Sequence, residues 1–403
     1  MNIEKQLEIL MQGTEYGDHT LEKSMRRELF TLLKENRPLR VYCGYDPTAT
    51  DLHLGHTITM RKLRQFQNFG HEVTFLIGDS TALIGDPSDK NKARPILNED
   101  DVKINASTFA EQAYTILDRK LTQIRYNSKW LNKLGFSDLI RLAQNFTIQQ
   151  FLSRNNFANR IANNEPVYLH ETFYALMQGY DAVAMKADVQ VGGTDQLFNI
   201  IVAGRKLQQM MGLKPQVGIV LSILPGTDGE QRMSKSMGNH IPIATTADDM
   251  FGKIMSIPDD AMGIYFRLAT RFSPDQIRDI ENEMESENIH PKDVKITLAS
   301  EITEIFCGLE KARDARERFA VVFGSGNLPD NIEDRQVNID DGIVDILVVC
   351  RFAKSKSEAR RLISQGAVKL SGSRIVDIHH HITDPGSKIL QVGKRKVVNL
   401  IVE

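Results

Sequence analysis

Two short segments of this chain carry residues whose types and spacing fit polyphosphate chemistry. The first is His53-Leu54-Gly55-His56, in which two imidazoles and a glycine stand where a helix is expected to begin. The second is Arg232-Met233-Ser234-Lys235-Ser236, which puts two cations on a loop with a glycine- and aspartate-rich approach. A helix N-terminus has free N–H groups that bind anions, and a mobile cation stabilises charge that develops on a leaving group. Together the segments predict a site that cleaves ATP between its α- and β-phosphates.

Each segment alone has a simpler interpretation. Two histidines at a helix start can cap that helix, and a polar loop with two cations is commonly just a solvated loop. What favours a nucleotide site is that both segments occur, in this order, each just beyond an expected strand. Gly55 adds to this interpretation because a residue without a Cβ lets a nucleotide ring approach the backbone closely.

The elements around these segments predict a parallel sheet whose carboxyl ends carry the site. Strand, helix and strand within about 40 residues form a βαβ unit, and ligands bind where such strands end. A helix over residues 21–36 precedes the first unit. The first unit comprises a strand at 39–44, a helix from the histidine segment to Phe69 and a strand at 72–78. The second comprises a strand at 187–191, a loop at 192–196, a helix at 197–211 and a strand at 217–224.

Polar residues in two other places are candidates for the same site. In the loop after residue 191, Gly193 permits close backbone approach, and Asp195 can accept hydrogen bonds from ribose hydroxyls. A plain strand-to-helix turn capped by Asp195 is the alternative. Tyr174, Gln178 and Asp181 have i, i+4, i+7 spacing and therefore share one helix face. A solvated polar face would show the same spacing.

Three residues next to prolines are open to two interpretations. Asp46 and Thr48 flank Pro47, and Asp86 precedes Pro87, so all three can serve simply as turn formers. Cys43, in the strand before them, is expected to be a small buried residue and not a nucleophile.

Composition sets the class of protein. The chain has 403 residues, 41% hydrophobic and 25% charged, with a net charge of −2, so no overall field drives nucleic-acid binding. We find no signal-peptide pattern and no apolar run of membrane-spanning length; the run at 343–350 has only the length of a strand. Cys43, Cys307 and Cys350 are far apart in sequence, which is typical of free thiols in a reducing cytoplasm.

The order of patterns predicts an α/β, Rossmann-like catalytic domain, an α-helical domain and a small α+β domain. Thr246 and Ser273 are expected to start helices of the second domain, and residues 292–323 read as one long helix. The expected boundaries are 1–240 for the first domain with a helical insertion at about 98–186, 241–325 for the second, a linker at 326–340, and 341–403 for the third.

The last domain carries a basic cluster in a chain that is slightly acidic overall. A capping box at Ser355 and Glu358 opens a helix to Gln365, and a hairpin is expected at 368–376. A basic helix followed by a hairpin favours an RNA surface, although a solvated charged helix is the alternative. His379-His380-His381 is expected to be a solvated loop and not a metal site. The candidate RNA-binding residues are Arg351, Lys354, Lys356, Arg360, Arg361, Lys369 and Arg374.

The combined motifs resemble bacterial tyrosyl-tRNA synthetase, and the resemblance covers essentially the whole chain. It is closest to the branch with a Lys-Met-Ser-Lys-Ser-type loop and with Leu197-Phe198 where other members have a tryptophan. The small last domain resembles the S4-type RNA-binding domain. The motifs that carry the resemblance are Val41-Tyr42-Cys43-Gly44-Tyr45-Asp46-Pro47-Thr48, His53-Leu54-Gly55-His56, Gly85-Asp86-Pro87, Tyr174 with Gln178 and Asp181, Gly192-Gly193-Thr194-Asp195-Gln196, and Arg232-Met233-Ser234-Lys235-Ser236.

The resemblance implies a role for each matching residue. Tyr42 and Asp181 would bind the tyrosine phenol, and Gln196 would lie near the tyrosine carboxylate. The α-ammonium would be held by Asp86, Tyr174 and Gln178. The ATP-binding residues would be Asp46, Gly55, Gly193, Asp195, Met233 and Ser234. The catalytic contacts to phosphates would come from Thr48, His53, His56, Lys235 and Arg232, the last of which stands where the family usually has lysine.

The resemblance also implies partners. We expect tyrosine, ATP and tRNA(Tyr) as substrates, a homodimer joined through the helical insertion, an anticodon-binding role for the helical domain, and no membrane. Mg²⁺ should come with ATP, held by phosphates and water, since no dedicated carboxylate cage is evident. Two rivals remain: an RNA-binding protein with an inactive synthetase-like core, and a tryptophan-specific synthetase of the same fold. Asp181 with Tyr42 favours a phenol over an indole.

Overall fold

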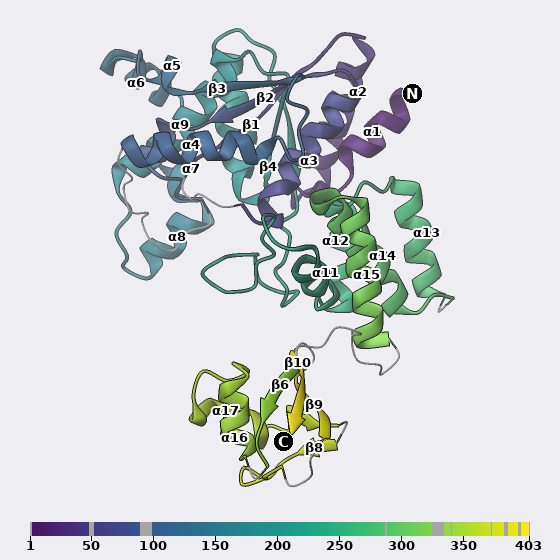
Figure 1. The fold of residues 1–403 in the computed structure, drawn as a ribbon. Coiled ribbons are helices and arrows are strands. Elements are labelled where there is room, and N and C mark those ends of the chain that lie inside the picture. Colours follow the sequence, from purple (N-terminus) through teal and green to yellow (C-terminus); the bar gives the residue numbers. More distant parts are fainter. Residues whose placement is uncertain are drawn as a thin grey trace. The chain divides into compact units, whose positions relative to one another are not determined.

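The computed structural model describes residues 2–47, 52–88, 99–286, 288–324, 334–339, 341–371, 373–382, 386–393 and 396–402. The chain forms two compact units, Met1–Ala312 and Arg313–Glu403, each with its own sheet (Figure 1). Among the described residues, no helix is both long and apolar enough to cross a membrane.

The first unit is built on a five-stranded parallel sheet with the order β3-β2-β1-β4-β5. Four of its strands confirm the predicted βαβ units, because parallel strands covered on both faces read as apolar runs. All five residues of β5 are buried, for example. The strands are β1 Arg40–Tyr45, β2 Glu72–Ile77, β3 Thr122–Tyr126, β4 Val189–Gly193 and β5 Val217–Leu221.

Strand β3 corrects the expectation that residues 98–186 are mostly helical. It pairs with β2 as the edge strand, and none of its residues is fully buried. Its sequence, Thr-Gln-Ile-Arg-Tyr, has no apolar run like those of the other four strands, which is why it was not predicted. The surrounding helices are as expected: α4 Glu99–Ala113, α5 Ser128–Leu131, α6 Phe136–Ala143, α7 Ile148–Leu152 and α8 Asn155–Ala162.

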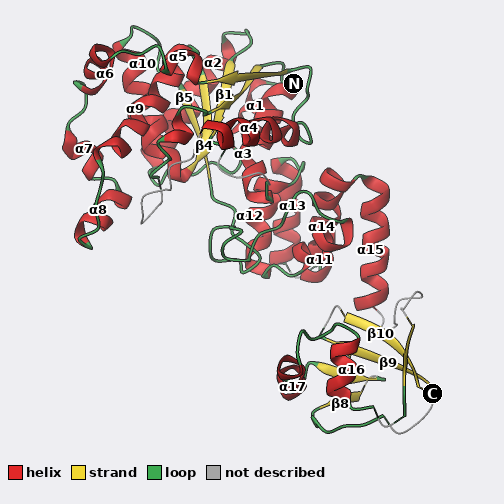
Figure 2. Cartoon of the chain, turned by 60° about the vertical axis from the view of Figure 1, so that its left-hand side comes forward, coloured by secondary structure: helices red, strands yellow, loops and turns green. Residues whose placement is uncertain are grey.

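Helices cover both faces of this sheet, as Figure 2 shows with α9 and α10 on one side and α1 and α3 on the other. Helix α3 packs on β1, β2 and β4, and α9 packs on α5 and α10. Local signals explain the helix ends: Asp18 accepts hydrogen bonds from two backbone N–H groups at the start of α2, and Gly70 follows α3 with a φ of 81°. The bounds are α1 Ile3–Met11, α2 His19–Lys34, α3 Leu54–Asn68, α9 Leu169–Ala184 and α10 Arg205–Met210.

The prediction of a single α-helix at 197–211 is wrong for its first half, which is a π-helix. A 3-10 turn, Thr194–Gln196, leads into a π-helix, Phe198–Gly204, and only then does α10 begin. A π-helix holds an extra residue per turn and is frequent at functional sites. Asn199 lies in it and is completely buried.

A group of helices follows the sheet in the first unit. Thr246 accepts a hydrogen bond from the Asp249 N–H and starts α11, and Ser273 starts α13, both as predicted. The long helix expected at 292–323 is in fact two helices, because Gly308 adopts a φ of 88° that ends the first. The helices are α11 Ala247–Met255, α12 Met262–Ala269, α13 Pro274–Glu285, α14 Pro291–Cys307 and α15 Leu309–Gly324, of which α15 begins in the first unit and continues into the second.

The second unit has a mixed five-stranded sheet with the order β6-β10-β9-β7-β8. Its apolar run at 343–350 forms helix α16, Ile343–Val349, although it has the length of a strand. The predicted helix and hairpin are confirmed: Ser355 caps α17, Lys356–Ser364, and β7 pairs antiparallel with β8. The strands are β6 Asp334–Val337, β7 Val368–Leu370, β8 Ser373–Ile375, β9 Gly386–Val392 and β10 Lys396–Val402.

Candidate active site

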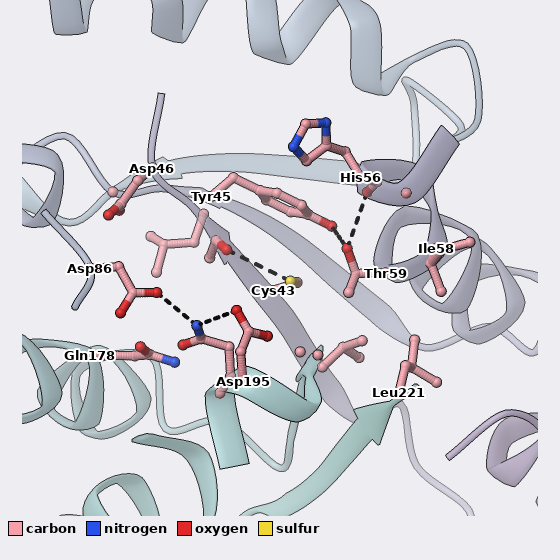
Figure 3. A pocket seen from close by; sticks show the side chains of 18 of the residues that line it. Cys43, Tyr45, Asp46, His56, Ile58, Thr59, Asp86, Gln178, Asp195 and Leu221 are labelled. Atoms are coloured by element: carbon pink, nitrogen blue, oxygen red, sulfur yellow. Dashed lines mark hydrogen bonds between the residues drawn. The ribbon is translucent and has the colours of Figure 1, made fainter. Parts of the chain in front are cut away.

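One cavity of the first unit opens at the carboxyl ends of β1, β4 and β5 (Figure 3). It brings together residues separated by almost 190 positions in sequence, as the parallel-sheet argument predicts. Tyr42, Ser234 and Lys235 are not in its lining, and Thr48 lies outside the described residues. The predicted site residues that line the cavity are Asp46, His53, Gly55, His56, Asp86, Tyr174, Gln178, Asp181, Gly193, Asp195, Gln196, Arg232 and Met233.

The two histidines both cap helix α3 and line the cavity, so the two interpretations of this motif are compatible. The backbone N–H of His53 donates to Nδ1 of His56 at 3.2 Å, and the two rings stack with centroids 3.7 Å apart. Because Nδ1 of His56 accepts this bond, the neutral ring carries its proton on Nε2. His56 therefore offers an Nε2–H donor.

Burial keeps both imidazoles neutral. It lowers the pKa of His53 to about 3, with His56, His240 and nearby cations adding to the effect. It lowers the pKa of His56 to about 4, and the cations Arg232 and Lys235 contribute. Each ring can thus donate one hydrogen bond to a phosphate oxygen without carrying a charge of its own at neutral pH.

The loop with the two cations is joined to the histidine segment by backbone contacts. Met233 is 2% exposed, and its Sδ accepts a hydrogen bond from the Gly55 N–H at 3.3 Å. Arg232 lies 3.7 Å from an Asp195 carboxylate oxygen across the cavity. Ser234 and Lys235 continue the loop outward, and Lys235 is exposed. The cavity therefore has one end with two imidazoles and at least one guanidinium, which suits an anion.

Carboxylates and amides form the opposite end of the cavity. In Figure 3, Asp86, Gln178 and Asp195 lie across the cavity from His56. Nε2 of Gln196 donates to Asp86 at 2.7 Å and to Asp195 at 3.2 Å. Asp86 also accepts from the Ser88 N–H at 2.8 Å, so the expected turn is present as well. This end suits a cation such as an ammonium group.

Asp46 is held in the cavity by two hydroxyl groups. Its carboxylate accepts from the Tyr174 hydroxyl at 3.0 Å and from the Thr81 hydroxyl at 2.7 Å. Gly78 makes room for it, because a Cβ at that position would lie 2.1 Å from an Asp46 oxygen. Asp46 is therefore fixed from two sides and is not merely a turn former.

Asp181 lies at the most enclosed part of the cavity. It is 3% exposed and accepts from Trp130 Nε1 at 2.7 Å and from Asn127 Nδ2 at 3.3 Å. Burial raises its pKa to about 8. The nearby Tyr42 hydroxyl is buried and makes no hydrogen bond among the described residues, and burial with the Asp181 charge raises its pKa. An unpaired hydroxyl beside a buried carboxyl is a fitting place for one more polar group.

Three residues that organise this site were not predicted from the sequence. Trp130 and Asn127 follow β3, the strand that was not predicted, and both bond Asp181. Asn199 donates to Gln178 and to Gln196, at 3.0 Å each, from the unexpected π-helix. Only two signals pointed to them: Trp130 is the single tryptophan of the chain, and Asn199 stands three residues after Gln196. Cys43 is buried with a pKa raised to about 12, as expected of a residue that is not a nucleophile.

The seven candidate RNA-binding residues of the second unit are all exposed. Lys369 and Arg374 face each other directly across β7 and β8, and a Cβ at Gly366, at the end of α17, would lie 3.2 Å from the Arg374 side chain. The hairpin of β7 and β8 thus places Arg374 next to the C-terminal end of α17. Two others are ion-paired, Lys356 with Asp345 and Arg361 with Glu358. The described residues contain no group of three or more His, Cys, Asp or Glu that could hold a metal ion.

Comparison with known proteins gives matches over both units. Residues 34–324 match the family of class I tRNA synthetases for tryptophan and tyrosine, and residues 327–396 match the tyrosine–tRNA ligase SYY-like C-terminal domain. The tyrosine–tRNA ligase of Thermotoga maritima is 44% identical over 396 residues, covering 98% of this chain and 97% of that protein. The tyrosine–tRNA ligase of Haemophilus influenzae is 47% identical over 369 residues, covering 92% and 91%.

Solved structures agree on the fold. A tyrosyl-tRNA synthetase from Archaeoglobus fulgidus, complexed with L-tyrosine, has a TM-score of 0.60 at 21% identity and covers 78% of this chain and 100% of its own. A truncated mitochondrial tyrosyl-tRNA synthetase from Aspergillus nidulans has a TM-score of 0.63 at 22% identity, covering 80% and 94%. At this identity the structural match speaks for the fold alone.

Proposed function

The chain belongs to the tyrosine–tRNA ligases, the tyrosine branch of the class I tRNA synthetases, and we propose how its residues perform that reaction. A tyrosine–tRNA ligase uses ATP to activate tyrosine and then charges tRNA. The carboxylate of tyrosine attacks the α-phosphate, the bond to the β-phosphate breaks, and pyrophosphate leaves; the tyrosyl group then passes to the 3′ end of tRNA. The observation that carries the proposal is the single cavity with imidazoles at one end and carboxylates at the other.

Tyrosine lies with its phenol at the enclosed end. The phenol takes the place beside Asp181 and the unpaired Tyr42 hydroxyl, where Trp130 and Asn127 hold the carboxyl in position. A phenol is both donor and acceptor, so it can satisfy both groups. An indole has one donor and no acceptor, and the relatives are tyrosine ligases, so both observations disfavour the tryptophan-specific rival.

The α-ammonium of tyrosine lies among Asp86, Gln178 and Tyr174. The Asp86 carboxylate supplies the charge, and the Gln178 carbonyl oxygen, which already accepts from Asn199, supplies a neutral acceptor. Gln196 then lies between Asp86 and Asp195, close enough to contact the tyrosine carboxylate. Asp195, with Gly193 before it, is placed to accept from ribose hydroxyls, as acidic residues do in nucleotide sites.

The phosphates lie at the other end, toward His53, His56 and the loop. Two neutral N–H donors bind phosphate oxygens, while Arg232 and Lys235 supply positive charge as pyrophosphate leaves. No covalent intermediate is needed, since positioning and electrostatic stabilisation of the phosphorus centre account for the chemistry. Mg²⁺ enters with ATP as part of the substrate. The phosphates and water would be its ligands, as Mg²⁺ commonly keeps several waters and binds substrate phosphates.

The exposed cations of the second unit bind tRNA phosphates. Like charges directly opposite on paired strands destabilise a sheet, so the Lys369–Arg374 pair has a cost that an anionic partner removes. We assign an anticodon-binding role to the helices at 241–325 and the S4-like role to the small domain expected at 341–403. Its sheet also contains β6, Asp334–Val337, so the boundary expected at 326–340 moves to residues before 334. Cys43, Cys307 and Cys350 are not joined in disulfides, which supports the cytoplasm as the compartment.

A homodimer formed through the helices between β2 and β4 is the proposed assembly. These helices and the start of α9 expose large apolar side chains, which is uncommon on a monomer. A charge at position 136 would disrupt such an interface, so Phe136→Asp should sediment as a monomer where the wild type sediments as a dimer. A wild-type monomer at micromolar concentration would contradict the assembly. The exposed residues are Phe136 at 80%, Leu169 at 68%, Ile140 at 52%, Ile148 at 51%, Tyr168 at 50% and Ile161 at 49%.

One assay tests the function directly: amino-acid-dependent exchange of labelled pyrophosphate into ATP, screened over the twenty amino acids. Exchange with tyrosine alone is the expected result. Exchange with tryptophan would support the second rival, and no exchange alongside tight RNA binding would support an inactive core that binds RNA.

A further inference from the structure

The loop that carries Arg232 and Lys235 closes on one buried side chain, Asn239. Asn239 is 5% exposed although it belongs to a surface loop. Its Oδ1 accepts a hydrogen bond from the Ser234 N–H at 2.8 Å, and its Nδ2 donates to Asp228 Oδ2 at 2.7 Å. Nδ2 has two longer contacts, 3.3 Å to the carbonyl of Arg232 and 3.5 Å to that of Gln231. One carboxamide therefore contacts four points of the loop.

The partner Asp228 is held from the other side of the loop. Its Oδ1 accepts from the Glu230 and Gln231 N–H groups at 3.0 Å each, so its second oxygen faces Asn239. The hydrogen bond from Asn239 is the largest cause that holds the pKa of Asp228 below its ordinary value. Asp228 and Asn239 thus connect the two arms of the loop through an amide donor and a carboxylate acceptor.

The backbone is shaped to admit this side chain. A Cβ at Gly226 would lie 2.3 Å from Cγ of Asn239, so only glycine leaves the space. The Thr227 N–H also donates to the carbonyl of Asn239 at 2.8 Å. A simple turn-forming asparagine bonds a group two residues away. Asn239 bonds one eleven residues away, which is tertiary positioning of the whole loop.

Asn239 also stands where the loop rejoins the rest of the site. Directly after it, the carbonyl of Ile241 accepts from the Leu54 N–H at 2.8 Å, and Pro242 forms a bridge with His53. Before Ser234 and Lys235, the Sδ of Met233 accepts a hydrogen bond from the Gly55 N–H. The Asn239 contacts therefore lie between two attachments to the histidine segment.

We propose that Asn239, held by Asp228, is a positioning residue for adenylate formation. It fixes the backbone from Arg232 to Ser234, so that the cations of the loop meet the phosphates that the histidines bind. The inference rests on the proposed role of the loop in tyrosine activation. Neither Asn239 nor Asp228 needs to touch the substrate.

Exchanging the two side chains gives a sharp test. In Asn239→Asp, two carboxylates face each other and the bond is lost. In Asp228→Asn, the N–H groups of the two side-chain amides face each other. If either amide rotates to avoid this, it loses its hydrogen bonds with the backbone N–H groups of the loop. In the double variant Asp228→Asn with Asn239→Asp, the amide introduced at position 228 donates to the carboxylate introduced at position 239, which still accepts from the Ser234 N–H. The double variant should therefore recover part of what each single variant loses, because the longer contacts from position 239 to the carbonyls of Arg232 and Gln231 stay lost.

The expected effect is on the rate and not on tyrosine binding. A displacement of about 1 Å in a positioned catalytic group costs on the order of 10²-fold in rate, so Asn239→Asp should slow tyrosine-dependent pyrophosphate exchange by about that factor. The KM for tyrosine should change little, because the hydrogen bonds of Asn239 go to residues of the loop and not to residues assigned to tyrosine. The double variant should be measurably faster than Asn239→Asp and slower than wild type, because only the bonds to position 228 and to Ser234 are restored. Glu230→Ala, an exposed residue whose backbone and not side chain bonds Asp228, is the matched control and should retain wild-type kcat.

A second readout does not depend on activity. Trypsin cleaves after Arg232 and Lys235, and Met233 is buried next to the first bond. Cleavage of the full-length protein at these two sites should accelerate in Asn239→Asp and return toward the wild-type rate in the double variant. A double variant that is no faster in exchange and no better protected than Asn239→Asp would overturn the proposal. A wild type without exchange, but with this protease pattern intact, would instead refute the proposed function and leave the positioning of the loop by Asn239 supported.

Discussion

Replacing Asp181 by asparagine removes an ionisable carboxyl group from the enclosed end of the cavity and keeps the size of the side chain. The two carboxyl oxygens accept from Trp130 Nε1 at 2.7 Å and from Asn127 Nδ2 at 3.3 Å. An asparagine amide has one acceptor oxygen and one donor nitrogen, so its nitrogen must face a donor. The tyrosine phenol then loses the charged acceptor that we assign to it.

The expected size of the effect follows from hydrogen-bond energies. A hydrogen bond to a charged group is worth about 1.5–3 kcal/mol, and each step of about 1.4 kcal/mol is tenfold in rate. The kcat/KM for tyrosine should therefore fall roughly 10- to 100-fold. Phenylalanine has no hydroxyl and loses no such bond, so the ratio of tyrosine to phenylalanine should fall by a similar factor.

The raised pKa of Asp181 predicts a pH dependence of stability and of tyrosine affinity in the wild type that this variant should lose. Burial raises the pKa to about 8 from 3.8, so the folded chain keeps a proton that the unfolded chain releases. This contribution to the free energy of unfolding is complete below pH 3.8 and is lost as pH rises to about 8. A phenol donor prefers the carboxylate, so tyrosine binding should release this proton and strengthen as pH rises through the same window.

The assay is pyrophosphate exchange with tyrosine and with phenylalanine, for wild type and for Asp181→Asn, with tyrosine affinity measured by calorimetry across the window. Asn127→Ala is the matched control, because it removes a donor to Asp181 and leaves the charge. The assignment is refuted if Asp181→Asn reduces both kcat/KM values in proportion, since Asp181 would then support the site without reading the phenol. A variant whose tyrosine affinity keeps the wild-type pH dependence would contradict the titration argument.

The remaining predictions concern the cations and the imidazoles. Lys235→Ala should slow adenylate formation on the order of 10²- to 10³-fold with little change in tyrosine affinity, because its charge acts on leaving pyrophosphate; a rate close to that of wild type in single-turnover kinetics would refute this. The double variant Lys369→Ala with Arg374→Ala should leave pyrophosphate exchange intact and reduce the salt dependence of tRNA affinity by about 0.7–0.9 per lost phosphate contact; an unchanged slope in filter binding would exclude these residues from the RNA surface. With pKa values of about 3 and 4, His53 and His56 should stay neutral from about pH 5.5 to 8, so their imidazole NMR signals should not shift over that range in the protein without ATP; a shift centred near pH 6.5 would contradict their burial.

Sequence alone predicted four strands of the first sheet but not β3. β1, β2, β4 and β5 contain apolar runs, and β5 is fully buried although it lies at one edge of the sheet. β3 is an edge strand with partly exposed, largely polar residues, so its identity depends on pairing with β2 and not on its own pattern. Gly308 likewise ends a helix only by taking a positive φ, and apolar periodicity continues on both sides of it.

The same limit applies to the candidate site. The motif residues were predictable because each carries its own polar group at the end of a predicted strand or on one helix face. Trp130, Asn127 and Asn199 act through Asp181, Gln178 and Gln196, which they contact only after β3 has joined the sheet and the π-helix has formed. Residues that position other residues leave no such pattern in sequence, because their partners are chosen by tertiary structure.

The arrangement of the cavity separates specificity from catalysis. Asp181 and Tyr42 are buried in a packed part of the first unit, so their contacts with a phenol form when tyrosine binds and persist through the reaction. Lys235 is exposed on a loop, where its position is set through Ser234 by Asn239 and not by a packed core. Only contacts that strengthen toward the transition state accelerate a reaction. Changes at the enclosed end should therefore alter which amino acid is accepted, whereas changes in the loop should alter how fast any accepted amino acid is activated.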